Sequence, residues 1–324
     1  MNGFYKIFLK LVLGLLISLI GVSIGLFAIF ELLPSDPARI MLGVNARPDT
    51  YAALRLEMQL DHPAFYRYYL WIKGLAQGDF GTSFVHQQAI GQMLAARFAI
   101  SGPLCLITIF FTLLLALPLG IYAAKNHQQL PDKALFMGFQ LFIAIPNFWL
   151  GLMLIFVFSI YFDLFAAGGF AGWRDEAGIF NMISILQGLK SLLLPAISLA
   201  LPQAALLAKT TRSALLGLLS SDFIRTAKAK GASEARIWWL HILPNAAVVI
   251  ATFIGLQISF LIAGAVIIEN LYFLPGIGSL LFQAVSERDL PLVKNILFML
   301  VGAIILIHYG VHYLSKWLDP RLRA

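Results

Sequence analysis

Residues 222–245 read DFIRTAKAKGASEARIWWLHILPN and separate two hydrophobic stretches that are each long enough to cross a bilayer. Four alanines in this segment favour helix, and four basic residues give it positive charge. Gly231 divides the segment near its middle. This pattern predicts two short helices joined at a glycine, lying against the membrane on its cytoplasmic side. Such an element can transmit a push from a soluble partner into the spans on either side of it.

Composition places the chain among membrane proteins. Of its 324 residues, 60% are hydrophobic and 12% are charged, whereas an average soluble domain has about 25% charged residues. A soluble protein of this size cannot hide so much apolar surface, so we predict an all-α polytopic membrane protein. The only cysteine, Cys105, excludes an intrachain disulfide. We attribute the net charge of +7 to basic residues held on the cytoplasmic face and not to a nucleic-acid partner.

Six stretches approach the roughly 20 apolar residues that a membrane-spanning helix needs. The predicted spans are 9–30, 98–123, 134–161, 191–209, 246–268 and 293–315. The first follows two lysines, as in a signal peptide, but its apolar part is too long for one and no cleavage site follows, so we expect it to be retained. Prolines are expected to interrupt the second, third and fourth spans, which neighbouring helices can tolerate. These prolines are Pro118, Pro146, Pro195 and Pro202.

The distribution of charge predicts the orientation. With both termini in the cytoplasm, the inside segments carry 13 basic and four acidic residues, and the outside segments carry 10 basic and 12 acidic residues. This arrangement agrees with the positive-inside bias. The chain is then divided into an N-terminal transmembrane helix at 1–30, an external, periplasmic segment at 31–97 and a core of about five spans at 98–324. The core includes a cytoplasmic loop at 210–245, between the fourth and fifth spans.

The external segment 31–97 is the only part with soluble character. Leu54 and Met58 recur there at helical spacing, and three tyrosines and Trp71 follow. One interpretation is a helix that lies on the membrane interface, where such aromatic residues gather. The other is a contact site for an external partner protein.

Motifs along nearly the whole chain are similar to those of one family. They are LPSDPARIMLG at 33–43, GDFGTSF at 78–84, IPNFWLGL at 145–152, IRTAKAKGASEARIWWLHILPNA at 224–246, GAVIIENLYFLPGIGSLL at 264–281, RDLPLV at 288–293 and DPRLR at 319–323. In this order and spacing the chain resembles the inner-membrane permease subunits of dipeptide, oligopeptide and nickel ABC importers. Members of that family are binding-protein-dependent transport components of the bacterial plasma membrane.

The resemblance implies a role for the segment around Gly231. The family's loop has Glu-Ala-Ala, three residues, Gly and then a spacer that ends in Leu-Pro. Ala227, Gly231 and the pair Leu243–Pro244 match, whereas Arg225 and Thr226 replace the first two residues, as in the peptide-importer branch. By this resemblance 220–230 is a coupling helix seated in a cleft of an ATPase subunit. The coupling residues are then Asp222, Phe223, Arg225, Thr226, Ala227, Lys228, Lys230, Gly231, Leu243 and Pro244. The alternative, a basic helix that binds anionic lipid, requires neither Gly231 nor Leu-Pro.

The chain lacks the motifs of an enzyme. It has no GxxxxGK[ST] loop to hold ATP phosphates and no zinc-binding spacing of histidines and cysteines. We therefore expect no cofactor in this chain, with ATP and Mg²⁺ bound by separate ATPase subunits. His308 and His312 share a helix face. They are either a ligand pair or proton relay, or they hydrogen-bond a neighbouring helix.

The predicted function is that of a permease subunit in an ATP-driven importer. It forms half of the pathway for di- or oligopeptides that an external binding protein delivers. The resemblance implies a heterodimer with a second homologous permease subunit and two P-loop ATPase subunits. Import of nickel or a metal chelate by the same mechanism is the alternative. A secondary transporter is disfavoured because the span centres carry few titratable groups, and the sequence assigns no substrate-binding residue.

Overall fold

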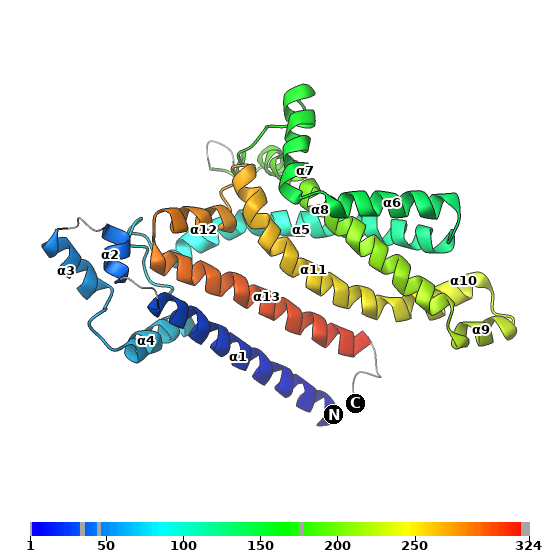
Figure 1. The fold of residues 1–324 in the computed structure, drawn as a ribbon, viewed down its shortest axis with the longest axis horizontal. Helices are drawn as coiled ribbons and strands as arrows, with labels where there is room; N and C mark the ends of the chain where they lie inside the picture. Colours follow the sequence, from blue (N-terminus) through cyan, green and yellow to red (C-terminus); the bar gives the residue numbers. More distant parts are fainter. Residues whose placement is uncertain (1, 33–35, 44–46, 175–177, 319–324) are drawn as a thin grey trace. The chain divides into compact units, whose positions relative to one another are not determined.

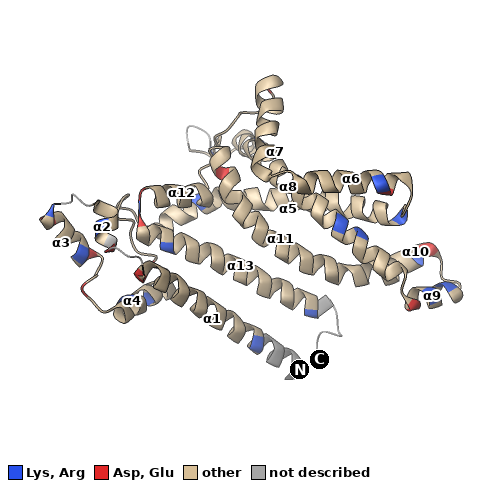
Figure 2. Ribbon diagram, viewed as in Figure 1, with Lys and Arg blue, Asp and Glu red and all other residues tan. Residues whose placement is uncertain are grey.

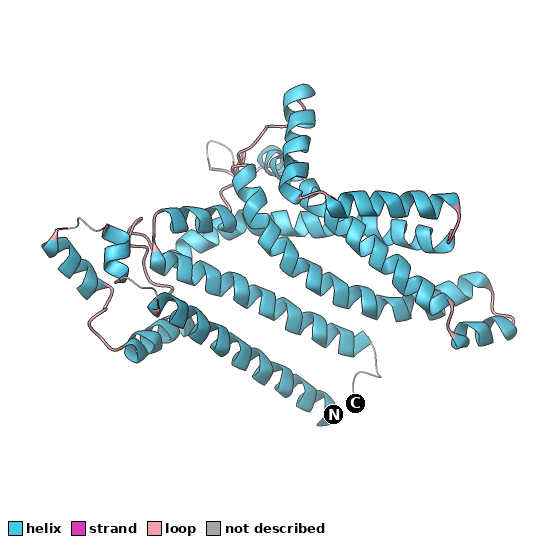
Figure 3. Cartoon of the chain, viewed as in Figure 1, coloured by secondary structure: helices cyan, strands magenta, loops and turns pink. Residues whose placement is uncertain are grey.

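The computed structural model describes residues 2–32, 36–43, 47–174 and 178–318. Over these residues the chain consists of helices and loops (Figure 3). Its one β-type contact among them is an isolated bridge between Thr82 and Ala89. This confirms the predicted all-α class. Helix prevails because apolar segments of this length must satisfy their backbone hydrogen bonds internally in lipid.

Five helices are long and apolar enough to cross a membrane. They are α1 (Asn2–Glu31), α5 (Ile90–Lys125), α8 (Met182–Leu219), α11 (Leu243–Leu271) and α13 (Leu290–Leu318), and Figure 1 shows them in chain order. The third predicted span is broken into α6 (Leu130–Ala144) and a second part made of α7 (Asn147–Leu154) and the π-helix η1 (Ile155–Tyr161). The two parts are bent by 99°. The residues described therefore hold five spans, or six if the bent pair is one span.

The prolines act differently in the third and fourth spans. Ile145, which precedes Pro146, is extended (φ −79°, ψ 124°), as expected of a residue before proline, and the chain turns there. In α8, by contrast, Pro195 and Pro202 lie inside one helix of 38 residues. Pro118 likewise lies inside α5. The expectation that prolines interrupt the second and fourth spans is therefore wrong. Within α8, Ser198 Oγ donates to Pro195 O at 2.7 Å, and α6, α7 and α11 pack against this helix.

The chain forms two compact units, residues 1–101 with 275–306 and residues 102–274 with 307–324. The first unit contains α1, the external helices, α12 (Ile277–Ser286) and the outer parts of α5 and α13. Its core is apolar and includes Ile90, Leu280, Leu292 and Ile296, all at most 1% exposed. These units are defined by contacts, so the predicted division at residues 30 and 97 stays a prediction.

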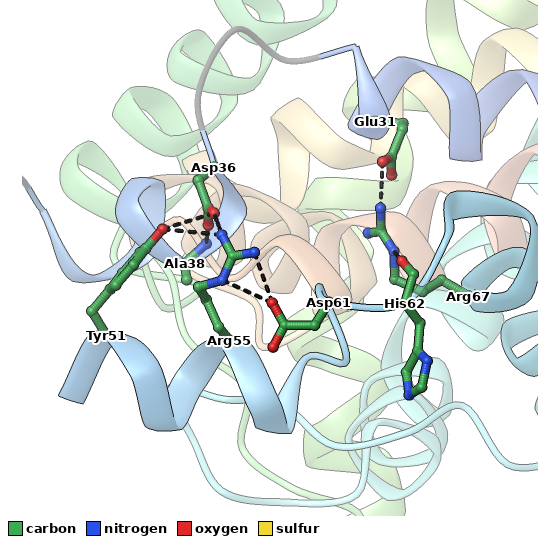
Figure 4. A network of polar contacts seen from close by, with 8 residues as sticks. All are labelled: Glu31, Asp36, Ala38, Tyr51, Arg55, Asp61, His62 and Arg67. Atoms are coloured by element: carbon green, nitrogen blue, oxygen red, sulfur yellow. Dashed lines mark hydrogen bonds and ion pairs between the residues drawn. The ribbon is translucent and has the colours of Figure 1, made fainter. Parts of the chain in front are cut away.

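Three helices make up most of the external segment: α2 (Pro37–Leu42), α3 (Pro48–Glu57) and α4 (Ala64–Ala76). Asp36 caps α2 by accepting from Ala38 N at 2.9 Å. It also binds the guanidinium of Arg55, which in turn reaches Asp61 at 2.9 Å (Figure 4). The hydrogen bond to Asp61 is the main cause that raises the pKa of Arg55 above its usual value. Arg55 thus joins α2, α3 and the turn that follows α3.

A buried carboxylate joins the turn at 78–84 to α13. Asp289 is fully buried, and its Oδ1 accepts from Leu292 N at 3.2 Å, which caps the start of α13. Its Oδ2 accepts from Ser83 Oγ at 2.5 Å. The same two residues belong to the sequence motifs GDFGTSF and RDLPLV. The motifs are therefore distant in sequence but joined in one unit.

In the second unit, α8 packs against α6, α7 and α11. Small residues line this core, with Ala116, Ala204, Ala205 and Ala208 all buried. The approach is close enough at Gly120 that a Cβ there would lie 2.8 Å from Ala208 O. Small residues permit such close approach between helices in a membrane.

Candidate coupling site

The predicted coupling segment forms an amphipathic helix, α9 (Asp222–Ala229), that directly follows α8. Ile224 is fully buried on its inner side, among Leu215, Trp238 and Ile242. Ala227, three residues later, contacts the same cluster. Helical spacing thus anchors one face of α9 in the second unit, and the other face is left exposed.

The exposed face carries most of the predicted coupling residues. Phe223 is 44% exposed, which is unusual for a large apolar side chain in a helix so rich in charge. Arg225 lies 3.7 Å from Asp222, and both side chains are largely in solvent. Figure 2 shows the basic residues of α9 and the acids that flank them. The exposed predicted residues are Asp222, Phe223, Arg225, Thr226, Lys228, Lys230, Gly231 and Pro244.

Gly231 ends α9 in a left-handed conformation, with φ +78°. Its N–H donates to Lys228 O at 2.9 Å, and the next N–H, of Ala232, donates to Ala227 O at 3.1 Å. This pair of bonds is a Schellman motif, in which glycine is favoured because it has no Cβ. The position explains the glycine without any contact to a partner.

The chain after Gly231 continues almost directly into the fifth span. Ser233 caps the single turn α10 (Glu234–Ile237), which leads into a π-helical turn, η2 (Trp238–Ile242), and then into α11. Leu243 and Pro244 lie where η2 passes into α11, and Pro244 has no N–H to donate within this run. The predicted second short helix is therefore the first turn of a helical run from Glu234 to Leu271.

The start of the helical run 234–271 contacts the C-terminal end of α5. Lys125, the last residue of α5, places its Nζ 4.9 Å from the ring centroid of Trp238. Ala124 belongs to the same buried cluster as Ile224 and Ile237. Three spans, α5, α8 and α11, thus meet at the inner face of α9.

A second polar contact joins α8 to α6 close to the coupling helix. Arg212, on α8, donates to Asp132 with Nε at 2.5 Å and with Nη2 at 2.7 Å. The side chain of Asp132 is 3% exposed, and its Oδ2 also accepts from Gln128 N at 2.9 Å. His127 Nδ1 lies 3.3 Å from the same carboxylate. In the predicted orientation Asp132 and Arg212 are two of the charges on the inner side, and the charge count alone does not pair them.

Sequence reasoning also missed the buried anchor of α9. Ile224, Ile237 and Trp238 were not predicted as site residues, although each is nearly or fully buried beneath the segment. The signal that could have found Ile224 is its spacing of three from Ala227. Of the predicted coupling residues, Ala227 and Leu243 are partly buried and pack against the buried cluster beneath α9. Their position indicates that they pack within the chain.

The two late histidines lie on the outside of α13. His308 and His312 are both exposed, and neither makes a hydrogen bond to another described residue. The described part of the chain also holds no group of three or more metal-ligating side chains. The role of the pair stays open between the two interpretations.

Comparisons with known proteins agree with the arrangement of helices. Residues 116–324 match the family described as "Binding-protein-dependent transport system inner membrane component", and residues 4–105 match its N-terminal family. The di/tripeptide transport system permease protein DppB of Pseudomonas aeruginosa is 33% identical over 334 residues, covering 96% of this chain and 97% of that protein. The glutathione transport system permease protein GsiC of Salmonella paratyphi A is 33% identical over 318 residues, covering 97% and 98%.

Among solved structures, an inward-facing methionine ABC transporter, MetNI, has a chain with a similar fold. Its TM-score is 0.55 at 15% identity, and the match covers 70% of this chain and 97% of that one. This likeness concerns the fold alone. The two family matches, which span most of the sequence, and the similar permeases identify the chain as a member of the binding-protein-dependent transport family, an inner-membrane permease component of an ABC importer.

Proposed function

We propose that this permease forms half of a translocation pathway for di- or oligopeptides, which an external binding protein delivers. The names of two relatives support peptides as the substrate. One is a di/tripeptide permease, and the other is a permease for glutathione, which is a tripeptide. A second homologous permease subunit supplies the other half. Both termini and α9 lie in the cytoplasm, and the segment 31–97 lies outside.

The observation that carries the proposal is the division of α9 into two faces. Its inner face is anchored through Ile224, where α5, α8 and α11 meet. Its outer face exposes Phe223 between charged residues. An exposed aromatic ring beside positive charge suits a protein contact. In this proposal two P-loop ATPase subunits, which bind ATP and Mg²⁺, grip the outer faces, and the anchor carries their movement into the spans.

Purification of the tagged permease from native membranes in mild detergent tests the assembly. Mass spectrometry is expected to find two P-loop ATPases, a second permease and a binding protein with it. A chain that purifies alone, yet transports in vesicles without ATP, would overturn the coupling role of α9.

Uptake into proteoliposomes tests the substrate. The reconstituted complex with its binding protein is expected to take up a labelled dipeptide in an ATP-dependent manner. Unlabelled di- and tripeptides should compete, whereas nickel ions should not. ATP-dependent accumulation of nickel that peptides do not inhibit would replace the peptide assignment and leave the ABC mechanism intact.

A further inference from the structure

The first unit contains a cavity of about 330 Å³ that the proposed function does not use. The end of α1, residues 57–60 at the end of α3, α4, the turn at 79–84 and the first two turns of α13 form its lining. α1 and α13 are both candidate spans, and the cavity lies at the end of α1 and the start of α13, which in the proposed topology are the external ends of the two spans. That depth is the headgroup region of a bilayer.

A lysine in an aromatic setting marks one part of the cavity. Nζ of Lys294 lies 4.4 Å from the ring centroid of Trp71 and 5.4 Å from that of Phe27. Trp71 is fixed, because its Nε1 donates to Asn295 Oδ1 at 3.0 Å. Asn295 in turn donates to Phe80 O at 3.0 Å. The rings that face the ammonium are therefore preorganised.

Among the residues that the structure describes, Lys294 makes no salt bridge, although Glu31 lies close enough to attract its charge. The nearby acid Glu31 is engaged by Arg67, as Figure 4 shows, and Arg67 also donates to His62 O at 3.2 Å. Aromatic faces attract a cation but leave its three N–H donors without conventional acceptors. An anionic oxygen entering the cavity can accept from Lys294 while the rings keep their contacts.

The remaining charges limit the kind of anion. Arg67 and Glu31, which also line the cavity, pair with each other. Glu57 and Asp79 are exposed and line it too, so a ligand with a second net negative charge is repelled. Phe30 and Leu70 give the lining an apolar part. We propose that the cavity binds one phospholipid of the ethanolamine class. Its phosphodiester accepts from Lys294, its ammonium faces Glu57 and Asp79, and an acyl chain covers the apolar part.

Native mass spectrometry of the whole importer complex tests this site. The complex, purified in mild detergent, is titrated with phosphatidylethanolamine, and retained lipid is counted. Lys294→Gln is expected to weaken retention about tenfold, the loss of one charge-assisted hydrogen bond. Lys73→Gln is the matched control, because Lys73 is an exposed lysine of α4 outside the cavity lining, and it should retain lipid as wild type does. Equal retention by the Lys294→Gln and wild-type complexes would overturn the proposal.

The same experiment tests which lipid headgroup binds and whether the ligand is a membrane lipid or a soluble molecule. Phosphatidylglycerol, which lacks the ammonium, should bind more weakly than phosphatidylethanolamine, and Glu57→Gln should remove that difference. Equal binding of the two lipids to wild type would overturn the headgroup assignment. Glu57→Gln keeps Lys294, so it carries the test if Lys294→Gln fails to assemble. Displacement of the lipid by glycerophosphoethanolamine or by a dipeptide would show a site for a soluble ligand and overturn the lipid assignment.

Discussion

At the scale of single residues, Gly231 is required for its backbone conformation and not for the space that its missing side chain leaves. Its φ is +78°, and no heavy atom lies within 4 Å of the position that a Cβ would take. Gly231→Val therefore meets no clash within the chain, but its backbone strain costs about 1 kcal/mol or more. We expect the variant to insert into the membrane, to hydrolyse ATP and to transport less peptide per ATP.

The matched variant is Gly231→Asn, because asparagine tolerates the left-handed conformation. Its ratio of peptide transported to ATP hydrolysed should stay near that of wild type. The measurement is uptake and phosphate release in the same proteoliposomes. Wild-type coupling by Gly231→Val would remove Gly231 from the coupling mechanism.

Asp132 and Arg212 give a prediction about stability. Asp132→Asn leaves the guanidinium of Arg212, whose side chain is 16% exposed, without its bidentate partner. Loss of such a charge-assisted pair costs about 2–3 kcal/mol. The Tm of the detergent-purified complex should fall by several degrees.

Asp222→Asn is the control for this change. It removes an equal charge from the exposed pair with Arg225, whose side chains are 96% and 76% exposed. Surface pairs of this kind contribute little, so the Tm should not move. An equal fall in both variants would mean that net charge, and not the pair, sets the stability.

At the scale of elements, the two faces of α9 should separate folding from partner binding. Ile224→Ala opens a cavity in a fully buried position, which costs about 3 kcal/mol. Phe223→Ala truncates an exposed ring and should leave the Tm of the permease unchanged. Only Phe223→Ala should lose ATPase subunits during purification while the permease itself remains stable.

Co-purification and Tm are measured on the same samples, so each variant controls the other. A drop in Tm without ATPase loss is the pattern expected of Ile224→Ala at low temperature. If Phe223→Ala retained its ATPase subunits fully, the exposed face of α9 would not be the docking surface proposed for it.

The elements also show what the sequence could predict. Apolar length and charge located α1, α5, α11 and α13, because a membrane constrains both. The effect of each proline was not predictable from its presence. Pro146 follows a residue in extended conformation and the chain bends by 99°, whereas Pro195 and Pro202 sit within one helix of 38 residues that packs against α6, α7 and α11. That difference depends on tertiary contacts.

The site was predictable to a similar degree. Motif spacing placed α9 and Gly231 correctly in the fold, since a helix and its glycine cap are local features. Ile224 has a local signal too, but the Asp132–Arg212 pair joins residues 80 apart in sequence. No periodicity connects such positions. The same holds for the cavity at Lys294, which brings together residues from both ends of the chain.

At the scale of the whole molecule, the proposed topology predicts which sites face which side of the membrane. With Cys105 replaced by serine, the chain has no cysteine, and single cysteines can be introduced at exposed threonines. Thr50→Cys in α3 should react with a membrane-impermeant maleimide on intact spheroplasts. Thr226→Cys in α9 should react only after permeabilisation.

The two positions form a matched pair, because both are exposed threonines on short helices outside the candidate spans. Labelling is quantified by gel shift against a fully denatured sample. The reverse order of reactivity would invert the topology and place α9 away from any cytoplasmic ATPase.

The buried carboxylate of Asp289 has a consequence for the speed of delivery. One carboxylate oxygen of Asp289 accepts from Ser83 and the other accepts from Leu292 N at the start of α13. The turn at 78–84 is therefore ordered by its contact with a span and needs no bound protein to order it. A surface that is already ordered gives up little conformational freedom when a partner docks. If the binding protein of the proposed function docks on this turn, the encounter needs no slow rearrangement on this side, and the association rate should follow diffusion and charge steering.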